Sequence, residues 1–135
     1  MLNPKMKKLV VAVAVAGGVI AAGYSARAGQ KTSNPASVDI TNRAAAGGLG
    51  STRSTADIYS YVGCATYRTS TDYFGVCQAR NAAAESGSCI TRDPMILANI
   101  RAVTPGTFVY YTWDINGNCD YVQIRTMSNM QPMVP

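Results

Sequence analysis

Four cysteines constrain this chain more than any other feature, and they lie in its last 80 or so residues, at Cys64, Cys77, Cys89 and Cys119. A domain of about 80 residues buries only about 60% of the surface of its unfolded chain, so hydrophobic burial alone leaves it marginally stable. An even number of Cys residues in a short exported chain is typical of a disulfide framework, in which each bond contributes on the order of 3 kcal/mol. We therefore predict a small domain held by two disulfides.

The pairing of these cysteines is less constrained, because four Cys residues allow three pairings. Residues 76–81 and 88–91 have the pattern of two short strands around the polar loop 82–87. That arrangement places Cys77 opposite Cys89 and leaves Cys64 to pair with Cys119. If residues 68–72 instead form a hairpin turn, Cys64 faces Cys77. We prefer the first pairing and keep the second as its alternative.

The N-terminal residues predict export. Residues 1–8 carry three Lys, residues 9–23 contain only Leu, Val, Ala, Gly and Ile, and Ala26 and Ala28 form an Ala-x-Ala cleavage signal. This is the pattern of a secretory signal peptide over residues 1–28. Fifteen apolar residues are too few to cross a bilayer, which takes about 20. We expect a periplasmic or extracellular protein, without a stable membrane anchor after signal cleavage, in a compartment where thiols oxidise.

Cleavage after Ala28 changes the electrostatic character of the chain. The full chain has a formal net charge of +5, and removal of residues 1–28 leaves eight basic and seven acidic residues, a net charge of +1. A nearly neutral domain has no strong field to attract phosphate backbones, so we expect no nucleic-acid partner.

Composition also excludes several chemistries. The chain has no His, which excludes a Ser/His/Asp triad, a Cys/His dyad and a His-ligated zinc. It has no Cys-x-x-Cys pair, no Gly-x-Ser-x-Gly and no Gly-rich phosphate loop. We expect a non-enzymatic protein with no catalytic residue, no metal and no cofactor. The alternatives are a small hydrolase using Asp114 and Asp120, and a short calcium loop over 114–120, whose residues a hairpin turn explains equally well.

The composition of residues 29–135 indicates two segments. Residues 29–55 are mostly Gly, Ala, Ser, Thr and Asn, and we expect a flexible spacer because such a segment buries too little apolar surface to offset its ordering entropy. The alternative is that residues 37–40 add an edge strand to the domain. For residues 56–135 we predict an α+β fold, in which one helix packs on a small antiparallel sheet.

The elements of this domain follow from local signals. Residues 56–64 alternate like a strand, and residues 107–113 and 119–126 flank Asn116-Gly117, which favours a two-residue type I′ hairpin. The register of that hairpin gives the core pairs Val109–Ile124, Tyr111–Val122 and Trp113–Asp120. Asp93 as N-cap and Pro94 as the first helical residue begin a helix. Its apolar stripe comprises Ile96, Leu97, Ile100 and Val103.

The same alternation predicts an aromatic outer face on the sheet. Its members are Tyr59, Tyr61, Phe108, Tyr110 and Tyr121. Aromatic rings offer a large contact area at a low cost in entropy, so these five residues are the candidate binding residues, for an unknown protein or carbohydrate partner. In the alternative, ring pairs or other segments cover this face. A second function class is a secreted inhibitor or effector that uses the loop over 80–87.

One resemblance spans about 45 residues of the chain. Its motifs are Cys77-x-Ala79-x-Asn81, Cys89, Asp93-Pro94, Trp113-Asp114 and Gly117-x-Cys119. This pattern resembles small exported bacterial proteins of unknown function. The resemblance implies a single exported domain stabilised by Cys residues, and it implies no activity, ligand or catalytic residue.

Overall fold

Two small antiparallel sheets carry the fold in the computed structural model, which describes residues 32–130. The predicted signal peptide over 1–28 lies outside the described residues. The elements in chain order are β1 (Ser37–Asp39), β2 (Ala44–Gly48), α2 (Leu49–Arg53), β3 (Tyr61–Arg68), β4 (Tyr73–Arg80), β5 (Ser86–Thr91), α3 (Pro94–Ile100), β6 (Phe108–Trp113) and β7 (Cys119–Arg125). No helix in this part of the chain is long and apolar enough to cross a membrane.

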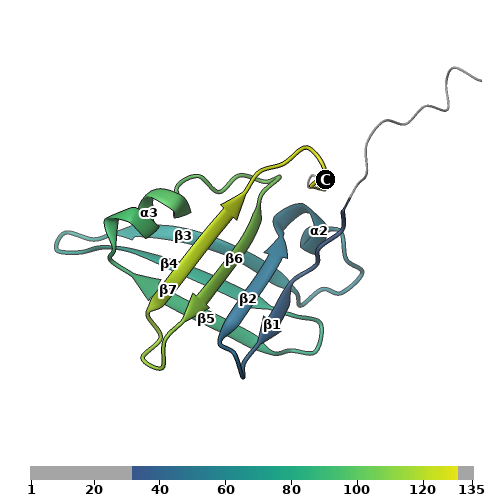
Figure 1. Ribbon diagram of the computed structural model, residues 1–135, viewed down its shortest axis with the longest axis horizontal. Coiled ribbons are helices and arrows are strands. Elements are labelled where there is room, and N and C mark those ends of the chain that lie inside the picture. The colour runs from purple at the N-terminus through teal and green to yellow at the C-terminus, as the bar shows by residue number, and fades with distance from the viewer. Residues whose placement is uncertain (1–31, 131–135) are drawn as a thin grey trace, which may run out of the picture. The chain divides into compact units, whose positions relative to one another are not determined.

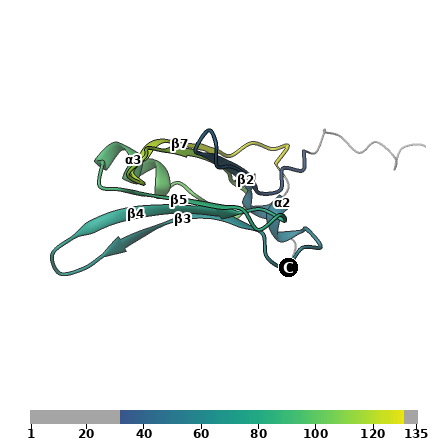
Figure 2. The same cartoon turned by 90° about the horizontal axis from the view of Figure 1, so that it is seen from below.

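The two sheets form two layers. One has the strand order β1-β2-β6-β7 and the other the order β3-β4-β5. Figure 1 shows the strands of one sheet crossing those of the other, and Figure 2 shows the layers edge-on, with α3 and α2 near opposite ends. The predicted α+β class with antiparallel pairing and two disulfides is confirmed. The chain adds a second sheet and a short second helix to that prediction.

The core lies between the layers, because alternate residues of each strand face inward. The side chains with almost no exposure come from both sheets, and they include Cys77, Ala79, Cys89, Val109, Tyr111 and Val122. Leu97 and Ile100 of α3 are also buried, and the Cδ1 atom of Ile100 lies 2.7 Å from where a Cβ on Gly75 would be. The small residues of β4 therefore let α3 pack closely on the sheet.

The expected spacer over 29–55 is wrong for its described part. β1, β2 and α2 lie in this segment, and β2 pairs with β6 along its whole length, from Ala44 with Thr112 to Gly48 with Phe108. The alternative of an edge strand near residues 37–40 agrees with β1. This segment is ordered because β2 gains ladder hydrogen bonds and burial from β6, whose paired residues lie 60 to 68 positions later in the chain. Its small side chains fit that crowded place, and Ala45 is only 2% exposed.

Most of the hairpin and helix predictions are confirmed. The register over Phe108–Arg125 to Thr112–Tyr121 is the predicted one, but Trp113 pairs with Cys119 instead of Asp120. The turn is not type I′, since Gly117 has a positive φ of 82° and Asn116 does not. The Asp114 carboxylate instead accepts three hydrogen bonds within a longer turn. Asp93 caps α3 by accepting from the N–H groups of Met95 and Ile96.

The strand expected over 56–64 begins later than predicted. Residues 56–60 form a loop in which the Asp57 carboxylate accepts from the N–H groups of Tyr59 and Ser60 and from the Ser60 hydroxyl. β3 starts at Tyr61 and continues to Arg68, where a turn leads into β4. The shift matters because it moves Tyr59 off the sheet and makes β3 an eight-residue strand.

The preferred disulfide pairing is wrong, and its alternative is found. Cys64 bonds to Cys77 and Cys89 bonds to Cys119. Cys77 does lie opposite Cys89 in the β4–β5 register, but it also lies opposite Cys64. Cys89 turns to the second sheet, where the N–H of Ile90 donates to Gly117 O at 3.0 Å and brings Cys119 close. Both disulfides fit an oxidising environment.

Candidate functional site

β3 presents an open backbone edge. Among residues 32–130 it pairs with β4 on one side and with no strand on the other. The Cα atoms of Cys64 and Cys77 are 4.0 Å apart, which is typical of a non-hydrogen-bonded antiparallel pair, so the N–H and C=O of Cys64 point away from β4. By the same alternation Val62, Thr66 and Arg68 direct their backbone groups outward. Within residues 32–130 no backbone hydrogen bond reaches this edge.

The other sheet edges are shorter or partly occupied in the described part of the chain. β1 has three residues, β5 donates a hydrogen bond from Ile90 N to Gly117 O, and Asn99 of α3 donates its Nδ2 to Val122 O of β7 at 3.2 Å. Proteins commonly protect open edges with Pro, Lys, a bulge or a very short strand. β3 has none of these devices along Tyr61–Arg68. It is therefore the strand best suited to receive another strand.

Three clefts border β3. The α2 cleft, about 220 Å³, lies where α2 meets the start of β3. The outer groove, about 200 Å³, runs along β3 between Tyr61 and Tyr67 and reaches Val76 and Gln78 of β4. The hairpin cleft, about 580 Å³, lies between the β3–β4 turn and the end of α3. Together these clefts follow the strand from its first residue to its last.

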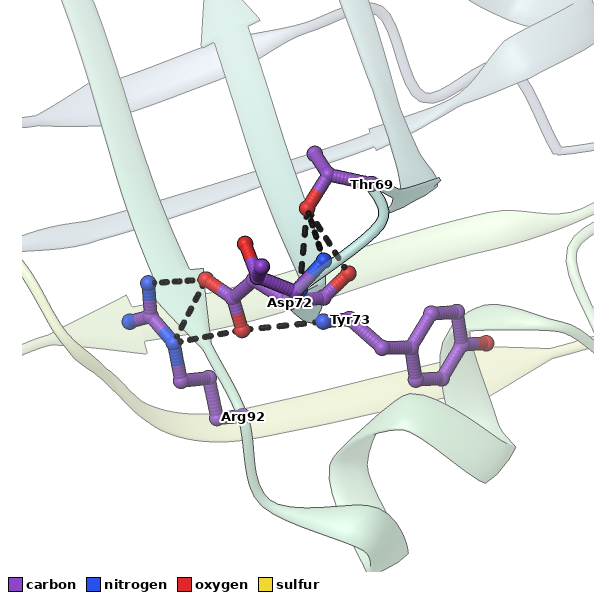
Figure 3. A network of polar contacts seen from close by, with 5 residues as sticks. Thr69, Asp72, Tyr73 and Arg92 are labelled. Atoms are coloured by element: carbon purple, nitrogen blue, oxygen red, sulfur yellow. Dashed lines mark hydrogen bonds and ion pairs between the residues drawn. The ribbon is translucent and has the colours of Figure 1, made fainter.

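The turn beside the hairpin cleft is held by polar contacts within it and by Arg92, which follows β5 (Figure 3). The Thr69 hydroxyl accepts from the N–H groups of Thr71 and Asp72, and Thr69 N donates to Asp72 O at 2.8 Å. The Asp72 carboxylate accepts from Arg92 Nη2 at 2.7 Å and Nε at 3.1 Å, and from Tyr73 N at 2.9 Å. These hydrogen bonds, that from Arg92 above all, hold the pKa of Asp72 below its ordinary value.

Two guanidinium groups line this cleft. Arg68 ends β3, and Arg101 follows the last residue of α3. Arg101 Nε donates to the Tyr73 hydroxyl at 2.7 Å, and the guanidinium carbon lies 5.1 Å from the centre of the Tyr73 ring. Within the described residues the one ion pair joins Arg92 to Asp72. The cleft therefore has a local excess of positive charge.

The α2 cleft combines apolar walls with a buried hydroxyl. Leu49 and Val62 supply apolar surface, and Thr52 is 4% exposed. Its Oγ1 atom has no hydrogen-bond partner among the described residues. A buried hydroxyl without a partner costs stability.

The candidate aromatic residues do not form one face. Phe108, Tyr110 and Tyr121 lie on the outer side of the sheet that contains β6 and β7, whereas Tyr61 belongs to the other sheet and Tyr59 precedes it in a loop. The expectation of a single aromatic face is wrong because the chain folds into two sheets. Tyr110 and Tyr121 contact each other edge to face at 6.0 Å, and Arg125 lies over Phe108.

β3 carries one exposed ring of the candidate set and a second exposed ring outside it. Tyr61 is 46% exposed, and Tyr67, which sequence reasoning did not select, is 50% exposed beside the outer groove. Tyr67 stacks on Phe74 with ring centres 5.4 Å apart. Tyr67 lies four residues after Gly63, on the same face of the strand, and this continued alternation was a signal for a longer strand. Arg68 and Arg101 were missed because nothing local indicates that the two residues share a cleft.

The other candidate segments are held by internal hydrogen bonds. In the loop over 80–87, Asn81 Nδ2 donates to the Glu85 carboxylate at 2.7 Å. The Asp114 carboxylate accepts from the N–H groups of Asn116 and Asn118 and from the Asn118 amide, which lowers its pKa. This direction is opposite to that needed for a general acid at neutral pH. Among residues 32–130 no three His, Cys, Asp or Glu residues are grouped closely enough to hold a metal ion.

No protein-family model, no curated protein and no solved structure matches the chain.

Proposed function

We propose that this protein is a non-enzymatic binding module, exported to an oxidising compartment, that binds an extended segment of another protein as an added strand along β3. Strand addition uses backbone hydrogen bonds for affinity and pockets for alternate side chains for specificity. The two disulfides support a role outside the reducing cytoplasm.

One observation carries this proposal: an open edge of eight residues is bordered by three clefts. Outward N–H and C=O groups at Val62, Cys64, Thr66 and Arg68 would pair with an incoming backbone. The clefts would take its side chains, since successive residues of a strand point to opposite faces. The Cys64–Cys77 bond braces the middle of the edge, so little ordering entropy is lost on binding.

A peptide fits this site better than a carbohydrate. A sugar would use flat ring surfaces, but one face of the exposed Tyr67 ring beside β3 already stacks on Phe74, and on the other sheet Tyr110 and Phe108 are half-buried against Tyr121 and Arg125 respectively. A peptide strand supplies both donors and acceptors at the spacing of β3. The proposed partner is therefore an extended protein segment.

Thr66→Pro tests the proposal directly. Thr66 is exposed and opposes Gly75 in a non-hydrogen-bonded pair, so proline removes an outward N–H without removing a β3–β4 ladder bond. Peptides are selected on the oxidised protein from a displayed library of random nine-residue sequences, and their affinities are measured by calorimetry. We expect Thr66→Pro to weaken binding about tenfold or more, and Thr66→Ala, which keeps the N–H, to preserve it.

Amide NMR spectra give the second readout. Bound peptide should slow hydrogen exchange at the outward N–H groups of Val62, Cys64, Thr66 and Arg68. A selected peptide that binds both Thr66 variants equally, or a library that yields no binder, would refute strand addition. Self-association that Thr66→Pro abolishes, in a protein that binds no peptide, would assign the edge to a second copy of this chain and would also refute the proposal.

A further inference from the structure

The hairpin cleft has a charge pattern that selects its occupant. Asp72 is the only carboxylate among the residues that line it, and Arg92 already binds this carboxylate through two nitrogens. Arg68 and Arg101 line the same cleft and have no carboxylate partner within residues 32–130. Two unpaired guanidinium groups beside one neutralised carboxylate attract an anion.

Arg101 is also held in a defined position. Its Nε donates to the Tyr73 hydroxyl, and its guanidinium lies over the Tyr73 ring. These contacts use one of its N–H donors and leave both Nη atoms without a hydrogen-bond partner in the described structure. A guanidinium whose plane is fixed in this way loses less entropy when it binds a planar carboxylate through two hydrogen bonds.

The register of an added strand places a side chain beside this cleft. Arg68 is the last outward-bonding residue of β3, and a residue opposite it on an added strand would have its Cβ within about 5.5 Å. Val62, at the other end, borders the α2 cleft. Positions opposite Val62 and Arg68 are six residues apart on the same face, a span of about 20 Å.

We infer that the segment bound along β3 is acidic, and that one of its carboxylates binds Arg68 and Arg101 in the hairpin cleft while an aliphatic residue six positions away enters the α2 cleft. This inference rests on the proposed strand addition and adds the class of ligand. Charge complementarity carries it: the cleft has two free cations, and the domain elsewhere presents no comparable pair in one described cleft.

The test compares a matched pair of peptides on the wild-type protein and on charge variants. A selected peptide is synthesised with its acidic residue and with the corresponding amide, Asp→Asn or Glu→Gln. We expect the wild-type protein to prefer the acidic peptide about tenfold, and the double variant Arg68→Gln/Arg101→Gln to lose that preference. Arg125→Gln, on the outer side of the other sheet, changes the net charge by one unit and should keep the preference. Added salt should reduce the preference of the wild type.

Succinate and succinamide separate this inference from the proposed function. We expect succinate to shift the side-chain Nε–H signals of Arg68 and Arg101, and succinamide at equal ionic strength to leave them unchanged. If peptides bind in a Thr66→Pro-sensitive manner but the double variant keeps the acidic preference, the charge inference is wrong and strand addition stands. If succinate shifts both signals but no peptide binds, strand addition is wrong and the anion site stands. Failure of both probes would overturn both proposals.

Discussion

Gly87 and Tyr111 set the spacing of the two sheets at the scale of single residues. A Cβ atom on Gly87 would lie 2.4 Å from Cη2 of Trp113 and 2.9 Å from its Cζ2. The carbonyl oxygen of the same glycine accepts from the Tyr111 hydroxyl at 2.6 Å. Aromatic rings of β6 therefore pack directly on the backbone of β5, and only the absence of a side chain at Gly87 permits it.

Gly87→Ala should destabilise the protein by about 1–3 kcal/mol, because the Trp113 ring or the β5 backbone must move to admit the methyl group. Urea denaturation measures the change. Gly63→Ala is the matched control, since a Cβ there meets nothing within 4 Å and its φ is not positive. Equal stability of the two variants would show that Trp113 does not pack on Gly87 in solution.

Because the Tyr111 hydroxyl is buried, we expect the protein to lose stability at alkaline pH. Burial raises its pKa above the ordinary value of 10.0, with a smaller contribution from Tyr61. A raised folded-state pKa means that the stability is fully present below about pH 10 and is lost as the pH rises above it, because the unfolded chain releases the proton first. Tyr111→Phe should cost about 1 kcal/mol at neutral pH through the lost hydrogen bond to Gly87.

The measurement compares the unfolding free energies of wild type and Tyr111→Phe between pH 8 and pH 11.5. The wild type should lose its advantage as the pH passes 10. Parallel curves over this range would place the Tyr111 hydroxyl in contact with water.

At the scale of elements, predictability followed local signals. α3 has a cap and Pro94, and β6 and β7 carry matching apolar alternation, so their positions and most of their register were readable. β2 is a run of three Ala and two Gly with no strand signal of its own, and it becomes a strand through β6. The open edge of β3 was also unreadable, because alternation identifies a strand but not which neighbours it lacks.

The ion pair between Asp72 and Arg92 links two elements, and we expect its contribution to stability to depend on pH in the acid range. The pair joins the β3–β4 turn to the end of β5. The pKa of Asp72 is lowered from its ordinary 3.8, so the stability that this pair contributes is present above pH 3.8 and is lost as the pH falls through the lowered value. Asp72→Asn should therefore be less stable than wild type at pH 7, and this difference should disappear in acid.

Thermal melts of both proteins between pH 2 and pH 7 measure this difference. Because Arg92 is 59% exposed, salt should weaken the contribution as well. A difference that persists unchanged to pH 2 would mean that Asp72 acts through its shape in the turn and not through its charge.

At the scale of the whole molecule, the two disulfides have different structural roles. Cys64–Cys77 joins neighbouring strands of one sheet, and Cys89–Cys119 joins the two sheets. The Cys spacing in the sequence predicted two bonds, but the pairing depended on a second sheet that β2 completes. The candidate site could not be predicted from the sequence for the same reason, because its clefts are lined by residues of α2, β3, β4 and the end of α3. Only the tertiary fold brings these residues together.

Removal of the disulfides one at a time should show which of them contributes more to the stability of the fold. Cys89→Ala/Cys119→Ala opens a loop of 30 residues and removes two buried half-cystines, whereas Cys64→Ala/Cys77→Ala opens a loop of 13 residues. Loop entropy alone gives about 3.6 and about 2.9 kcal/mol, and the link between sheets adds the packing of β5 against β7 to the first value. We expect the Cys89/Cys119 variant to melt at the lower temperature in calorimetry. The opposite order would mean that bracing of the β3 edge, and not the attachment of one sheet to the other, limits the stability of the fold.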